Sequence, residues 1–187
     1  KQDFTFSRST TGTYTDSDGY IQEMPYNLLE QSNTFDTTWV KSSTIVTSGQ
    51  SGYDGGSDAW LLEANTASSA NIRQGITANG VLSLSFYAKS GTTDSFALRS
   101  DDATTVAWFN VSSGVVHSTG VSVIDAEIES IGSGWYRCNV VFDSCISARL
   151  YISDSYGSYS VTSGANIYIQ NAQLVKGTSA KTYFPTT

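Results

Sequence analysis

The stretch VLSLSFYAKS at residues 81–90 decides the fold class, because apolar and polar side chains alternate along it. Leu82, Leu84, Phe86 and Ala88 fall on one face of an extended strand, and Ser83, Ser85, Tyr87 and Lys89 fall on the other. A period of two is the pattern of a strand with one buried face. The stretch therefore predicts a half-buried β-strand.

Similar segments recur along the chain, separated by Gly, Ser, Asp and Thr. They predict strands at residues 71–77, 81–89, 95–99, 106–111, 135–142, 148–153 and 166–175. No segment has the 3.6-residue period of an amphipathic helix. The sequence therefore predicts an all-β protein, an antiparallel β-sandwich (jelly roll) of two packed sheets.

Composition limits the partners of the chain. Its 187 residues suit one sandwich domain, 14% of them are charged, and the net charge is −7. A negative surface repels phosphate backbones, so nucleic acid is not an expected partner. No run of 18 apolar residues occurs, so membrane insertion is not expected either.

The first 26 residues read as a separate lead-in segment, and the sandwich domain is expected at residues 27–187. Phe4–Tyr14 and Ile21–Gln22 flank an Asp-Gly pair that favours a hairpin turn. Asp16-x-Asp18-Gly19 also allows a calcium loop, although most of a twelve-residue ligand loop is missing. Lys1–Arg8 lacks a signal-peptide core and reads as the cut end of a longer chain.

Alternation in four predicted strands suggests a ligand-binding face. If residues 81–89, 95–99, 135–142 and 148–153 share a sheet, its outer face carries Tyr87, Lys89, Arg99, Arg137, Asn139, Arg149 and Tyr151. Aromatic rings stack on the C–H faces of pyranoses, and Arg forks suit carboxylate or sulfate groups. The set predicts a polysaccharide site with a preference for anionic chains. The alternative is an ordinary solvated face with cross-strand pairs.

Four further aromatic residues are candidates for the same role, each with packing as the alternative. They are Trp108, Trp135, Tyr156 and Tyr159. Trp108 is expected to be exposed if Phe109 and Val111 are core, whereas packing is favoured for Trp135 at a strand start. Tyr156 and Tyr159 lie in a Ser- and Gly-rich loop, where exposed Tyr often stacks on a ligand. Trp39 and Trp60 are expected to pack in the sandwich.

The two cysteines and the single histidine give no catalytic signal. Cys138 and Cys145 are expected to flank a turn near Asp143-Ser144, with buried free thiols favoured over a disulfide. His117 reads as a surface residue.

No nucleophile elbow or metal-ligating motif is present, so a non-enzyme is favoured. Glycoside hydrolysis needs only two carboxylates, and Asp101-Asp102 or Asp125, Glu127 and Glu129 could supply them. A lyase using Tyr87, Arg137, Asn139 and Tyr151 stays open as an alternative.

Five short motifs occur in the same order as in a known family of domains. NLLEQSNTFDTTW at 27–39 is similar to the opening "NLL…S..F…W", LSFYAK at 84–89 to "FSFYVK", and GWYR at 134–137 to "GWYR". IYIQNAQL at 167–174 with TYFPT at 182–186 is similar to "IWGAQLE…SYIPT", and FSRSTTGTY at 6–14 to "FTRASTATY". These motifs cover nearly all of the chain, and together they resemble jelly-roll carbohydrate-binding domains of phage tail and fibre proteins.

These domains are in turn distantly similar to family 4, 9 and 22 carbohydrate-binding modules. The resemblance implies a glycan cleft on one sheet. It implies a structural Ca²⁺ near Asp36 and Asn171, where an amide replaces an expected Asp. It also implies an extracellular or virion-surface location and a polysaccharide partner. A homo-oligomeric fibre or decoration domain with a purely structural role is the main alternative.

Overall fold

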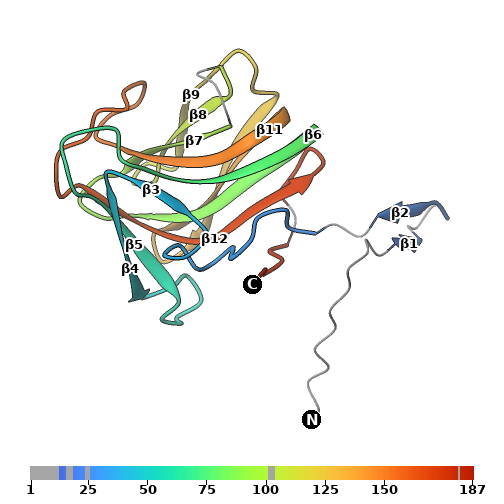
Figure 1. Cartoon of the computed structure of the whole chain (residues 1–187), viewed down its shortest axis with the longest axis horizontal. Coiled ribbons are helices and arrows are strands. Elements are labelled where there is room, and N and C mark those ends of the chain that lie inside the picture. The colour runs from blue at the N-terminus through green and yellow to red at the C-terminus, as the bar shows by residue number, and fades with distance from the viewer. Residues whose placement is uncertain (1–12, 16–18, 24–25, 101–103, 181) are drawn as a thin grey trace, which may run out of the picture.

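A computed structural model describes residues 13–15, 19–23, 26–100, 104–180 and 182–187. Its described residues form strands and no helix, and the strand pairs are antiparallel. The strands are β1 Thr13–Thr15, β2 Ile21–Glu23, β3 Val40–Ser42, β4 Thr44–Gln50, β5 Ala59–Ala64, β6 Asn71–Ser90, β7 Ser95–Arg99, β8 Val106–Asn110, β9 Val115–Thr119, β10 Asp125–Gly132, β11 Trp135–Ser153 and β12 Asn166–Lys176. The predicted all-β sandwich is confirmed (Figure 1).

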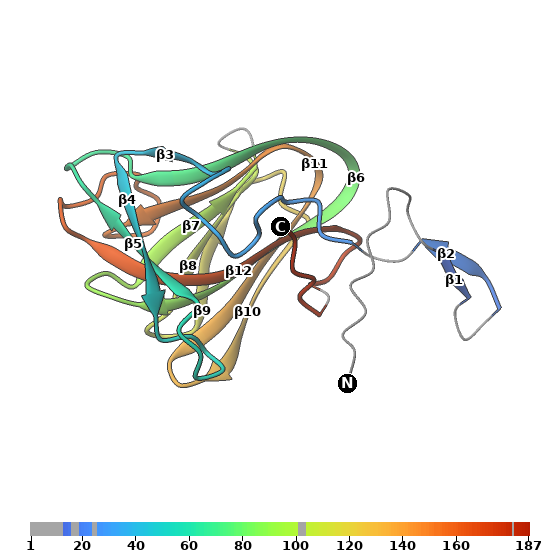
Figure 2. The same ribbon diagram turned by 60° about the horizontal axis from the view of Figure 1, so that its bottom comes forward.

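Two long strands, β6 and β11, run through both layers of the sandwich (Figures 1 and 2). Leu82–Ser90 of β6 pairs with β12, and residues 82–89 pair with residues 135–142 of β11. The first layer therefore has the order β4-β5-β12-β6-β11-β10. The other halves of β6 and β11 pair with each other and form the second layer, in the order β3-β6-β11-β7-β8-β9.

The bend between the layers lies where the pairing of β6 with β11 is irregular. Register shifts occur in β11 between Phe142 and Ser144 and between Cys145 and Ser147. In the facing part of β6, Gly80 has a φ of 86°, which a side chain would disfavour. Bulges bend a strand and increase its twist, so one continuous sheet folds over on itself.

The core lies between the two layers and is rich in aromatic rings. Phe35 and Trp39 precede the first sandwich strand and pack on Phe86 of β6, with ring centroids 6.2 and 5.7 Å away. Phe96 and Phe109 stack at 5.4 Å from the second layer. All of them belong to one buried cluster, so the two layers share a single core. Trp60 belongs to it as well, which confirms the predicted packing of Trp39 and Trp60.

Several predicted strands are parts of longer ones. Residues 71–77 and 81–89 are both in β6, and residues 135–142 and 148–153 are both in β11. The predicted turn near Asp143-Ser144 is wrong, because the chain bulges there and continues as a strand. Cys138 and Cys145 are buried and are not joined in a disulfide, as expected.

The predicted pairing next to the lead-in turn is confirmed, since β1 pairs with β2 in a sheet of two strands. Residues 4–12 of the predicted first strand lie outside the described residues, as do residues 16–18 of the turn and with them the alternative calcium loop. The division at residue 26 stays a prediction. Within the described part of the chain, no helix is long and apolar enough to cross a membrane.

Candidate functional site

The predicted ligand-binding face is divided between two surfaces. Tyr87, Lys89, Arg137 and Asn139 belong to the first layer, whereas Arg99, Arg149 and Tyr151 belong to the second. Leu84, Phe86, Leu98 and Leu150 from both layers point into the shared core. The side chains at the alternate positions of these strands therefore point outward, on opposite sides of the sandwich. The expectation of one common face is wrong, because the sheet folds over between the halves of β6 and β11.

The outer surface of the first layer, here called the Tyr87 face, gathers Tyr87 and Lys89 of β6, Arg137 of β11, Tyr168 of β12 and Tyr53 of the β4–β5 loop. Register aligns these residues: Arg137 lies opposite Tyr87, and Tyr168 lies opposite Lys89. All five are half-buried. The face thus offers rings and cations that are supported by the sheet and remain accessible.

The β4–β5 loop is held on this face by Gln170 of β12. Gln170 Nε2 donates to Asp58 Oδ1 at 2.8 Å, and its Oε1 accepts the backbone N–H of Tyr53 at 3.3 Å. A Cβ on Gly52 would lie 2.8 Å from Gln170 Oε1 and 2.9 Å from Asp58 Oδ1. A side chain at position 52 would therefore displace these hydrogen-bonded oxygens, whereas glycine lets the loop lie flat against the sheet.

The docked loop places the Tyr53 ring against Tyr87, with centroids 4.8 Å apart at an interplanar angle of 78°. Burial, with Tyr87, Asp54 and Asp58 nearby, raises the pKa of Tyr53 above its ordinary value. Burial also raises the pKa of Tyr183, whose hydroxyl is 2.7 Å from Ser32 Oγ. Both phenols are therefore neutral at physiological pH and can donate hydrogen bonds.

A pocket of about 340 Å³ opens between the loop and the sheet, lined by Gln50, Ser51, Lys89 and Tyr168. This volume is within the range of small-ligand sites. Its lining combines an aromatic ring with amide, hydroxyl and ammonium groups. That combination can stack on a sugar ring and hydrogen-bond to its hydroxyls.

Beyond this pocket, the Tyr87 face carries an ion pair. Arg137 Nη2 donates to Glu129 Oε2 of β10 at 2.5 Å. Asp125, Glu127 and Glu129 all lie at exposed positions of β10, opposite Val141, Asn139 and Arg137. Arg137 thus has an acidic partner, so this face does not by itself favour an anionic chain.

Two predicted binding residues of the first layer are buried. Trp135 is 1% exposed, which agrees with the packing role favoured for it from the sequence. Asn139 is 2% exposed. Ser83 Oγ donates to Asn139 Oδ1 at 2.5 Å, which turns the amide toward β6 and away from solvent. Burial excludes both from surface contact with a polysaccharide.

On the second layer, the 154–164 loop covers the aromatic residues that were expected to be exposed. Tyr159 packs on Trp108 at 5.1 Å and on Tyr151 at 4.6 Å, leaving these two 4% and 6% exposed. Phe109 and Val111 are core as assumed, but the exposure expected for Trp108 is wrong because the loop folds back over it. Tyr156 stacks on His117 at 4.7 Å, and both are exposed.

Asp36 and Asn171, the predicted calcium ligands, both use backbone groups in hydrogen bonds with other residues. Asp36 is exposed, and its backbone carbonyl accepts a hydrogen bond from Lys41 Nζ at 2.9 Å. Asn171 is buried, and its backbone N–H donates to Asn33 Oδ1 at 2.9 Å. Among the described residues, no group of three or more His, Cys, Asp or Glu could hold a metal ion. The calcium ion stays a prediction without support from these two residues.

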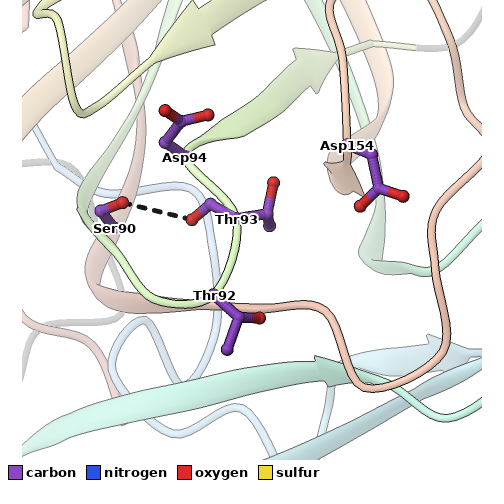
Figure 3. A pocket seen from close by; sticks show the side chains of 5 residues that line it. All are labelled: Ser90, Thr92, Thr93, Asp94 and Asp154. Carbon is purple, nitrogen blue, oxygen red and sulfur yellow. Dashed lines mark hydrogen bonds between the residues drawn. The ribbon is translucent and has the colours of Figure 1, made fainter.

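A second pocket, of about 320 Å³, lies at the end of the sandwich and is lined by Ser90, Thr92, Thr93, Asp94 and Asp154 (Figure 3). Asp154 Oδ2 already accepts both the N–H and the hydroxyl of Thr162, at 2.7 and 2.6 Å. The lining holds no aromatic ring. The pocket therefore suits a sugar less well than the Tyr87 face.

Sequence reasoning missed Tyr53 and Tyr168. Tyr168 had a signal, because it alternates with Ile167 and Ile169 along a predicted strand. Tyr53 had none, because it lies in the Gly-rich 48–56 stretch and reaches the face only through the docked loop.

No family model and no curated protein matches the chain. Solved structures similar to it include carbohydrate-binding modules. A family 29 module mutant has 7% identity and a TM-score of 0.42, over 81% of this chain and 90% of that one. The Paenibacillus barcinonensis Xyn10C xylan-binding CBM22-1 domain has 13% identity and a TM-score of 0.43, over 83% and 95%.

A third similar structure contains the CBM22-1 and GH10 modules of Clostridium thermocellum xylanase 10B in complex with xylohexaose. It has 15% identity to this chain and a TM-score of 0.48. The match covers 86% of this chain and 30% of that one. At these identities and TM-scores, the function of the chain has to be argued from its own residues.

Proposed function

We propose that this domain binds a polysaccharide at the Tyr87 face without cleaving it. The observation that carries the proposal is the pocket between the loop and the sheet, which is lined by Gln50, Ser51, Lys89 and Tyr168. The neighbouring Tyr53–Tyr87 pair extends the aromatic surface. Sugar rings stack on such faces, and the polar lining groups hydrogen-bond to hydroxyls.

The arrangement of carboxylates supports binding without catalysis. A glycosidase needs one carboxyl group held protonated and a second one ionised across the scissile bond. Glu129 is paired with Arg137, and Asp125 and Glu127 lie at exposed positions of β10. None of these three lines either of the two pockets described above. Asp101 and Asp102 lie outside the described residues.

The motif resemblance supports a place for the domain on a virion surface or in a secreted multidomain protein. Display in several copies would raise the modest affinity expected of one open site.

The test is affinity electrophoresis of the full chain in gels that contain a panel of neutral polysaccharides. We expect retardation by at least one, and weaker retardation of Tyr168→Ala. Tyr156→Ala is the matched control, since it removes an exposed ring from the second layer and should leave retardation unchanged.

Failure of every polysaccharide to retard the chain would reject the proposal. A stable oligomer that shields Tyr168, without polysaccharide binding, would instead favour a structural role. Release of reducing ends or unsaturated products from the bound polysaccharide would contradict the non-catalytic part.

A further inference from the structure

The pocket of the Tyr87 face contains one cationic side chain. Lys89 lines this pocket together with Tyr168, Gln50 and Ser51. Its Nζ makes no hydrogen bond or ion pair with any residue that the structure describes. Lys89 is half-buried, so its charge remains accessible to a ligand in the pocket.

The register of the first layer places this charge beside the aromatic ring of the pocket. Lys89 and Tyr168 lie directly opposite each other on β6 and β12. The Cβ atoms of such a pair are about 5 Å apart. A pyranose ring that stacks on Tyr168 therefore has its edge within reach of the lysine. In a uronic acid the C6 carboxylate projects from that edge, where an ammonium group can pair with it.

The stem of Lys89 is supported on its other side by the start of β11. Trp135, which lies opposite Lys89 on that strand, is buried. A Cβ on Gly134 would lie 3.7 Å from Lys89 Cε, so the stem lies beside the β10–β11 turn. The apolar stem is thus covered while the charged end stays accessible. A supported side chain loses less conformational entropy when it binds a ligand.

The other charges of the Tyr87 face disfavour a densely anionic chain. Arg137 adds no free charge, because Glu129 pairs with it. A Cβ on Gly52 would lie 2.9 Å from Asp58 Oδ1 and 3.0 Å from Asp54 Oδ1, so two carboxylates lie together in the docked loop. They repel a chain that carries an anionic group on every unit, whereas Lys89 attracts a single carboxylate.

We propose that the pocket of the Tyr87 face selects an isolated uronic acid unit of an otherwise neutral polysaccharide, with the carboxylate bound by Lys89. This selection rests on the proposed function, because the sugar ring has to stack on Tyr168. It adds the class of polysaccharide, which is a neutral chain with spaced uronic acids.

The experiment measures binding of the full chain to fluorescein-labelled gellan and glucuronoxylan by anisotropy at physiological ionic strength. The matched probes are the same polysaccharides after carboxyl reduction, which converts their uronic acids into neutral sugars. We expect at least one acidic form to bind about fivefold more tightly than its reduced form, the effect of one partly exposed ion pair. Polygalacturonate, with a carboxylate on every unit, should bind less tightly than that acidic form.

Lys89→Gln should lower the affinity for the acidic form to that for the reduced form, and it should leave binding of the reduced form unchanged. Lys89→Arg keeps the charge and should retain the preference. Lys41→Gln is the control for charge, because it removes the same charge from an exposed position of β3 in the second layer. If Lys89→Gln does not fold, Lys89→Met provides the same comparison.

Equal binding of the acidic and reduced forms overturns the selection of uronic acids but leaves the proposed function in place. No binding of either form, together with no retardation by the neutral panel, rejects both. The selection is also overturned if Lys41→Gln lowers the preference as much as Lys89→Gln does, or if polygalacturonate binds most tightly.

Discussion

Tyr87 is the residue on which the candidate polysaccharide face depends. It lies opposite Arg137 and Gln170 on the neighbouring strands, and it supports the ring of Tyr53 at 4.8 Å. Its side chain thus joins the sheet to the docked loop.

Tyr87→Ala is expected to weaken polysaccharide binding by about 1 kcal/mol, roughly fivefold in Kd, because Tyr53 loses its support. Tyr87→Phe keeps the ring and should retain most of the affinity. Isothermal titration with the polysaccharide found in the gel assay measures both. Equal losses in the two variants would contradict a role of the ring itself.

Cys138 gives a prediction about alkaline stability. Burial raises the pKa of this thiol well above its ordinary value. The unfolded chain therefore ionises first, from about pH 8.5, and stability falls as pH rises from there toward the folded-state pKa.

When the pH is raised from 7 to 9.5, the free energy of unfolding should fall in both proteins. The fall should be about 1.4 kcal/mol smaller for Cys138→Ala than for the unsubstituted chain. Urea denaturation at the two pH values tests this, and the tyrosines contribute equally to both proteins. Parallel pH profiles would show that the thiol does not contribute.

At the scale of elements, the β4–β5 loop controls access to the first-layer pocket. Gln170 and Asp58 fix it to β12 at a point where a Cβ on Gly52 would displace their side-chain oxygens. The loop residues from Asp54 to Asp58 are exposed, so the loop adds little to the core.

Gly52→Ala is expected to lift the loop from β12 and weaken polysaccharide binding, while Tm changes by only a few degrees. Ser57→Ala, an exposed change in the same loop, is the control. Affinity electrophoresis and thermal denaturation give the two readouts. Retained affinity in Gly52→Ala would show that the loop does not shape the pocket.

At the scale of the molecule, one core joins the two layers. Phe86 and Ile169 of the first layer and Phe109 and Leu150 of the second belong to the same buried cluster. We expect a single cooperative unfolding transition in urea, with coincident curves from tryptophan fluorescence and far-ultraviolet circular dichroism. Separated curves would mean that the layers unfold independently.

Deletion of residues 1–26 tests the predicted domain boundary. β1 and β2 form their own two-stranded sheet, and the buried cluster begins at Leu29. The midpoint of urea unfolding should therefore stay within error of that of the full chain. A clear decrease would place the lead-in segment within the cooperative unit.

The sequence by itself determined the all-β class, the buried faces of the strands and the burial of the two cysteines. Alternation depends on neighbouring residues of one strand, so Leu84, Phe86, Val140 and Leu150 were placed in the core correctly. Only the tertiary structure decided which outward side chains share a surface. The bulges in β11 and the bend near Gly80 separate Tyr87 from Arg149, and two loops bring in Tyr53 and cover Trp108. Strand parity fixes the side of a sheet, whereas the bend of that sheet is set by pairing between residues distant in the sequence.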